Sequence, residues 1–121
     1  MLIDALRGRA AADRLLGLGR SSPVPFVCAV NVEELARGLR DGEEPSVERL
    51  LAGLRMAPLG RGEGERAGSW RRAYAAMGVT LSQADCLVAA AAVGVGAGLA
   101  TGNPKHFPMP ELQVDHWPVG V

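Results

Sequence analysis

The sequence predicts an α/β fold with a mainly parallel sheet. Residues 25–30 and 98–101 are continuously apolar rather than alternating apolar and polar, which is typical of strands covered on both faces. Residues 86–92 are rich in alanine and carry no charge, so they predict a helix that is buried on most sides. Helices that separate apolar strands along a chain indicate parallel pairing through crossover connections.

The helices expected in the first half are defined by apolar spacing and by capping residues. Residues 3–18 place apolar side chains three and four positions apart and end before Gly19, as an amphipathic helix does. Asn31 is expected to cap the helix after the first apolar strand, with Glu34 at its third position. Ser46 follows an Asp-Gly turn and is expected to cap the next helix.

The second half carries equally local signals. A helix over 66–77 follows a glycine-rich loop and is closed by Gly78. Ser82 is expected to cap the alanine-rich helix. The apolar strand after it leads into a polar loop over 102–107, and residues 112–116 are expected to form a last, edge strand. In chain order the predicted helices span 3–18, 31–39, 46–55, 66–77 and 82–93, and the predicted strands span 25–30, 56–59, 98–101 and 112–116.

Composition restricts the class of protein. The chain has 121 residues, of which 48% are hydrophobic and 21% charged, so one folded domain over residues 1–121 is expected and a disordered chain is excluded. Thirteen basic residues balance thirteen acidic ones, so no global basic field attracts nucleic acid. Cys28 and Cys86 form no CxxC pair, and no signal peptide or membrane span is evident. We therefore expect a cytoplasmic protein with reduced thiols.

Two carboxylates, those of Glu34 and Asp85, stand out as candidates for chemistry. Each is expected in the first turn of a helix, where a negative charge gains about 0.3–1 kcal/mol from the helix dipole, so capping explains both. The alternative is that they converge on a divalent metal, because Mg²⁺ and Mn²⁺ prefer carboxylate oxygens and keep several waters. Such an ion activates water and stabilises charge on a phosphodiester under attack. Spacing along the chain leaves both interpretations open.

Three segments together carry a family resemblance: VCAVNVEELARG at 27–38, SQADCLVAAAA at 82–92 and LATGNPKHF at 99–107. In this order and spacing they resemble PIN-domain proteins, and more narrowly the VapC-type toxins of bacterial toxin–antitoxin pairs. The resemblance implies a three-layer α/β/α, Rossmann-like domain and a Mg²⁺- or Mn²⁺-dependent endoribonuclease. It also implies a cognate antitoxin, an RNA substrate and a second toxin subunit as partners, and no membrane.

The resemblance also assigns roles to residues. Glu34 matches the family's active-site Glu, and Asp85 matches a metal-binding Asp. A further acid that the family often has in the last loop is replaced here by a histidine. The implied catalytic residues are Glu34, Asp85 and Asn103, the implied metal ligands are Glu34 and Asp85, and the implied substrate contacts are Thr101, Lys105 and His106.

The chain departs from the family pattern at its start. Family members begin with a short hydrophobic strand that ends in a metal-binding Asp, whereas this chain opens at Met1 with Leu2, Ile3 and Asp4. That run matches the residues after the strand, so Asp4 does not match the missing ligand. We therefore expect an N-terminally truncated domain without its central first strand and its first catalytic Asp, and little or no nuclease activity.

Alternatives from other classes remain. A non-catalytic PIN-like protein that binds an antitoxin or RNA agrees with the missing Asp, and an unrelated small α/β binding domain is a weaker alternative. Trp70 and Tyr74 are one helical turn apart and are expected to pack inward or at an interface. Arg66, Arg71 and Arg72 on the same helix suit RNA phosphates or a solvated face, of which the solvated face is the simpler interpretation.

Overall fold

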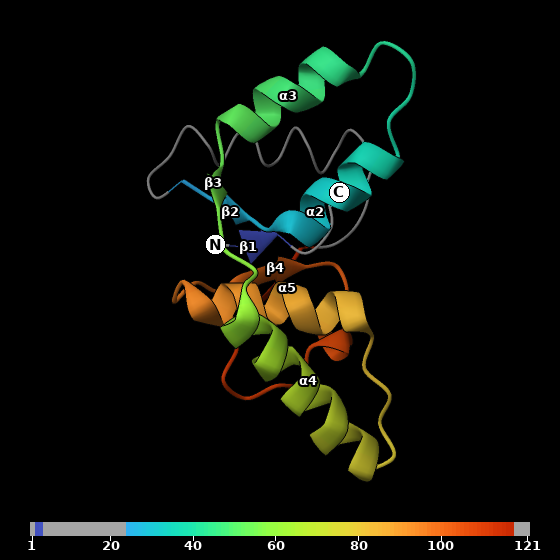
Figure 1. Ribbon diagram of the computed structural model, residues 1–121, viewed down its shortest axis with the longest axis vertical. Coiled ribbons are helices and arrows are strands. Elements are labelled where there is room, and N and C mark those ends of the chain that lie inside the picture. Colours follow the sequence, from blue (N-terminus) through green and yellow to red (C-terminus); the bar gives the residue numbers. More distant parts are fainter. Residues whose placement is uncertain (1, 4–23, 118–121) are drawn as a thin grey trace.

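The computed structural model describes residues 2–3 and 24–117, and the strands in these ranges form one parallel sheet (Figure 1). The strand order is β3-β2-β1-β4-β5, and every neighbouring pair is parallel. The α/β class and the parallel pairing predicted from sequence are therefore confirmed. The strands are β1 (Leu2–Ile3), β2 (Phe26–Val27), β3 (Arg55–Met56), β4 (Leu99–Thr101) and β5 (Val114–His116), and the helices are α2 (Ala29–Arg37), α3 (Glu44–Ala52), α4 (Arg61–Ala76), α5 (Gln83–Gly94) and the 3₁₀ turn η1 (Pro104–His106).

The core lies where α5 meets the sheet. Residues 89–92 of α5 are alanines that are at most 1% exposed, and such small side chains let the helix approach β1 and α4 closely. Figure 1 shows α4 and α5 on one side of the strands and α3 on the other. Within the described ranges, no helix combines the length and the apolar character needed to cross a membrane.

The centre of the sheet corrects the prediction of a missing strand. Leu2 pairs with Phe26 on one side and with Leu99 on the other, and Ile3 pairs with Ala100. The backbone N–H of Leu2 donates to the carbonyl of Gly98 at 2.8 Å, and Leu2 is fully buried. The unpaired backbone groups of β2 and β4 require a strand between them, and this apolar pair supplies it. The neighbouring strands are therefore not left open, and the expectation of an absent central strand is wrong. Because β1 holds only Leu2 and Ile3, it supplies no carboxylate, and the missing first catalytic Asp and the low activity expected from its loss stay predictions.

The helix expected over 3–18 is wrong at its first residue, since Ile3 is in β1. The rest of that helix, Asp4 included, lies outside the described residues.

The start of α2 also differs from the prediction. The strand β2 stops at Val27, because Asn31 Oδ1 accepts a hydrogen bond from the backbone N–H of Cys28 at 2.8 Å. Cys28 is thereby the N-cap and Asn31 the third helical residue. The helix and its cap begin three residues earlier than expected, and Glu34 lies in the second turn rather than the first.

Two further helix starts were misplaced. Helix α3 begins at Glu44 rather than Ser46, with a proline in its first turn, where the missing N–H costs nothing. Helix α4 begins at Arg61 rather than 66. The reason is a cap at its N-terminal end, where Glu63 Oε1 accepts a hydrogen bond from the backbone N–H of Gly60 at 2.7 Å. The predicted cap of α5 at Ser82 and the edge position of the last strand are confirmed. The strand predicted over 56–59 lies instead at Arg55–Met56, and the last strand begins at Val114 rather than 112.

Candidate active site

The predicted site residues lie where parallel strands end. The strand β4 ends at Thr101 and leads through Asn103 into η1, while β2 ends just before α2. Because all strands of the sheet are parallel, their carboxyl ends share one edge, which is where α/β proteins bind ligands. The fold therefore gathers the loop after β4 and the start of α2 at the same edge.

Asp85 sits in the first turn of α5. Ser82 Oγ accepts a hydrogen bond from the backbone N–H of Asp85 at 3.0 Å, so the capping interpretation holds for its backbone. The carboxylate has a second neighbour, since its Oδ2 lies 3.6 Å from Nδ1 of His106. Both side chains are partly exposed, so this contact contributes little stability. It does show that Asp85 and the loop after β4 meet.

Thr101 and Asn103 are joined by a hydrogen bond within that loop. The Oγ1 of Thr101 accepts from the backbone N–H of Asn103 at 3.0 Å. Thr101 is only 1% exposed, so a substrate cannot reach it in this conformation. Asn103 and Lys105 are exposed and remain reachable.

Glu34 lies on another element, the helix α2. It is half-buried in the second turn of α2, whose first turn carries no acidic residue. The capping interpretation therefore fails for Glu34. Its negative charge acts on Cys28, whose pKa is raised first by burial and further by Glu34. The packing of α2 against α5 brings the helix of Glu34 beside the helix of Asp85.

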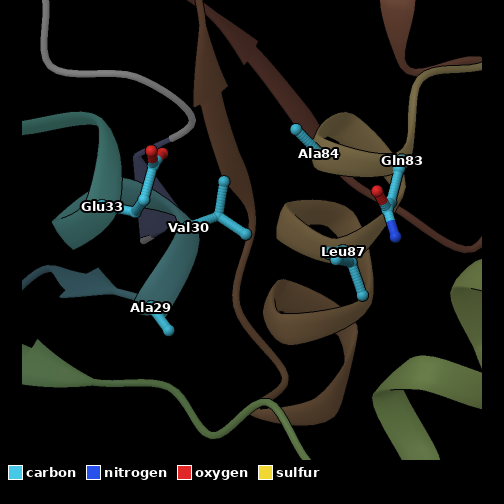
Figure 2. A pocket seen from close by; sticks show the side chains of 6 residues that line it. All are labelled: Ala29, Val30, Glu33, Gln83, Ala84 and Leu87. Carbon is cyan, nitrogen blue, oxygen red and sulfur yellow. The ribbon is translucent and has the colours of Figure 1, made fainter. Parts of the chain in front are cut away.

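An open hollow of about 300 Å³ separates α2 from α5 near their first turns. Figure 2 shows Glu33 and Gln83 on opposite sides of it, with Val30 between them. Sequence reasoning missed Glu33, because it singled out the adjacent Glu34 from the motif. The spacing along the helix would have indicated it, because Glu33 lies three positions after Val30 and the two therefore share a helix face. The hollow is lined by Ala29, Val30, Glu33, Gln83, Ala84 and Leu87.

The donors available for a metal are few among the described residues. Within them, no group of three or more His, Cys, Asp and Glu side chains is close enough to hold an ion. Asp85 and its neighbour His106 supply one carboxylate and one imidazole, and Glu34 does not join them in a group of three among the described residues. An ion such as Mg²⁺ or Mn²⁺ bound at Asp85 would therefore keep most of its ligands as water, as these ions often do.

Of the two aromatic side chains of α4, Trp70 packs inward, which is one of the two alternatives expected from the sequence, whereas Tyr74 is only partly buried. Trp70 is 7% exposed, and its indole Nε1–H donates to Oε2 of Glu111 at 2.6 Å. Arg66 stacks over the Trp70 ring at 5.8 Å from its centroid. Arg71 instead reaches the segment before α5, where its Nε–H donates to the carbonyl of Leu81 at 3.2 Å.

Comparison with known proteins adds independent findings. The family described as "PIN domain" matches residues 1–109. The chain is 38% identical over 110 residues to Ribonuclease VapC10 of Mycobacterium tuberculosis, covering 90% of this chain and 82% of that protein. It is 32% identical over 114 residues to Ribonuclease VapC19 of the same organism, covering 92% and 90%.

Solved structures show the same fold. VapBC2 from Rickettsia felis, bound to a DNA fragment from its promoter, matches with a TM-score of 0.74 at 19% identity, over 97% of this chain and 99% of that chain. VapBC-1 from nontypeable Haemophilus influenzae matches with a TM-score of 0.74 at 19% identity, over 97% and 96%. At these identities the likeness concerns the fold.

Proposed function

We propose that this chain, which belongs to the PIN-domain family and is related to the VapC ribonucleases, is a metal-dependent endoribonuclease toxin of a toxin–antitoxin pair. The observation that carries the proposal is the meeting of Asp85 with the loop after β4, at 3.6 Å from His106. These are two of the three segments on which the family resemblance rests. The relatives named ribonucleases, 38% and 32% identical to this chain, support the activity.

Each site residue receives a role from its position. Asp85 and Glu34 hold the metal, since they are carboxylates on neighbouring helices. Asn103 and Lys105 are exposed and orient the phosphodiester, with His106 beside them. Thr101 is buried and holds the backbone of Asn103, so we assign it a positioning role in place of a substrate contact.

The metal supplies chemistry that these side chains lack. A bound Mg²⁺ or Mn²⁺ acidifies water and neutralises charge on the phosphate. Asp85 and Glu34 provide the hard oxygen donors that such an ion prefers. The protein side chains hold the substrate in line, which reduces the entropic cost of reaching the transition state.

The test is cleavage of single-stranded RNA with Mg²⁺ or Mn²⁺ and with EDTA. Because the first catalytic Asp of the family pattern is missing, the unmodified chain should cleave slowly, and Asp85→Asn should abolish the metal-dependent part of that cleavage, since a metal contributes several kcal/mol to charge stabilisation. Glu48→Gln is the matched control, because Glu48 is an exposed acid on α3, and it should leave the rate unchanged. Cleavage that persists in EDTA or in the Asp85→Asn variant would contradict the proposal.

A second candidate is a non-catalytic PIN-like protein that binds an antitoxin or RNA. The described residues favour it in one respect, because they contain no group of three or more potential metal ligands. Such a protein would bind RNA with and without Mn²⁺ and cleave none. Electron paramagnetic resonance of Mn²⁺ distinguishes the candidates, since only the enzyme should bind the ion through Asp85.

For partners we propose a cognate antitoxin and a second copy of the chain. The antitoxin is supported by the matched structures, which are VapBC assemblies. Exposed Met77 and Val79 offer apolar surface for a partner. Co-purification with the product of the adjacent small gene tests the first, and light scattering of the pure chain tests the second.

A further inference from the structure

Arg71 is held in a defined position beside the site. Its Nε–H donates to the carbonyl of Leu81 at 3.2 Å, and Leu81 is buried directly before the N-cap of α5. The other N–H groups of the guanidinium make no hydrogen bond within the described ranges, and Arg71 forms no ion pair with a carboxylate there. Arg71 is also exposed. An oriented positive charge with unused donors therefore faces solvent next to the helix of Asp85.

Other side chains on the same turn of α4 are also held in place by hydrogen bonds. Trp70 is buried and bonded to Glu111 at 2.6 Å. The hydroxyl of Tyr74 donates to the carbonyl of Pro108 at 3.0 Å. The same helical turn that carries Arg71 thus contacts the segment after η1 as well as the segment before α5. Side chains fixed in this way lose less conformational entropy when they bind a ligand.

Hydrogen bonds place Arg71 at the end of α5 that carries Asp85. Arg71 Nε–H donates to the carbonyl of Leu81 at 3.2 Å, and the next residue, Ser82, accepts a hydrogen bond from the backbone N–H of Asp85 at 3.0 Å. The Asp85 carboxylate also lies 3.6 Å from His106 Nδ1, and Lys105 is next to His106 in η1. Basic or polar side chains of α4 and η1 are thus both held at the N-terminal end of α5.

We propose that Arg71 is a substrate-binding residue that contacts a backbone phosphate of the RNA strand bound over Asp85. This inference rests on the proposed function and names a contact outside the family motifs. A planar guanidinium suits phosphate oxygens, because its terminal N–H groups donate two parallel hydrogen bonds. The bond to Leu81 uses Nε, which leaves the terminal nitrogens for the phosphate. Arg71 therefore differs from a cation of a solvated face, which holds no fixed orientation.

The chain offers a matched control in Arg72. Residue 71 lies about 100° around α4 from buried Trp70, and residue 72 about 200° from it. Arg72 is exposed and lies on the side of α4 opposite to buried Trp70, so it shares charge and helix with Arg71 but not location. Arg71→Gln removes the positive charge and keeps an N–H donor for the Leu81 carbonyl. Arg71→Lys keeps the positive charge but replaces the guanidinium by an ammonium group with fewer N–H donors.

The experiment measures binding of a short fluorescein-labelled single-stranded RNA to the full chain by anisotropy, in EDTA, over a range of salt concentrations. Arg71→Gln should raise Kd about tenfold at low salt and reduce the slope of log K against log salt by about 0.7, the value for one phosphate contact on a single strand. Arg71→Lys should keep the wild-type slope. Arg72→Gln should leave Kd and slope near wild type.

The outcomes separate the possible errors. Equal effects of Arg71→Gln and Arg72→Gln, or an unchanged slope in Arg71→Gln, would overturn the inference and leave the proposed function standing. A purely structural Arg71 would lower the melting temperature in Arg71→Lys and leave the salt slope of Arg71→Gln unchanged. No RNA binding by the unmodified chain would count against the proposed function itself, and the inference would fall with it.

Discussion

Replacement of Ser82 by alanine should destabilise the protein through one identified hydrogen bond. Ser82 Oγ accepts from the Asp85 N–H at 3.0 Å, and Ser82 is the extended N-cap of α5. Loss of an N-cap costs about 0.5–2 kcal/mol. Ser82 is exposed, so water replaces part of the bond, and we expect a loss near 1 kcal/mol. With a urea m-value of about 2 kcal/mol/M, the midpoint should fall by about 0.5 M at unchanged slope.

Ser46 provides the control for this substitution. Both serines look like caps in the sequence, but Ser46 is the third residue of α3 and not its N-cap. Ser46→Ala should therefore leave stability unchanged or raise it by about 0.5 kcal/mol, since alanine has the higher helix propensity. Ser82→Asp should restore most of the stability, because aspartate also caps. Equal losses in Ser46→Ala and Ser82→Ala would refute the reasoning.

Three further predictions concern stability. Glu111→Ala should cost about 1–2 kcal/mol in urea unfolding, because the Trp70 indole loses its acceptor at 2.6 Å; no change would contradict a structural role. Gly68→Ala should raise the melting temperature, since the added methyl meets nothing within 4 Å in α4, whereas Gly78→Ala should lower it, since Gly78 has a φ of 80°. The raised pKa of Cys86 means that the folded state holds the thiol proton more tightly. Its stability contribution is present at neutral pH and is lost as pH rises above 9.0, the ordinary thiol value; Cys86→Ala should flatten that fall in urea titrations.

Features of the candidate site were predicted correctly from the sequence where they depend on residues close together in the chain. The cap of α5, the strand before Asn103 and the inward packing of Trp70 depend on neighbours within a few residues or on one helix face. The meeting of Asp85 with His106 also agrees with the motif order. Glu33 and the hollow beside it were not predicted, because a hollow exists only where α2 and α5 are already packed.

The sequence by itself determined the α/β class, the parallel pairing and the three segments on which the family resemblance rests, since continuous apolar runs and capping residues act over short distances. Only the tertiary structure decided that Leu2 and Ile3 form the central strand, because their hydrogen-bonding partners at Phe26, Gly98 and Ala100 are remote in the chain. The same holds for Arg71, whose proposed role depends on its hydrogen bond to the Leu81 carbonyl, across the turn between α4 and α5. Hydrogen bonds between near neighbours can be predicted from a few adjacent residues. The pairing of distant backbone groups depends instead on which segments the packed core brings together.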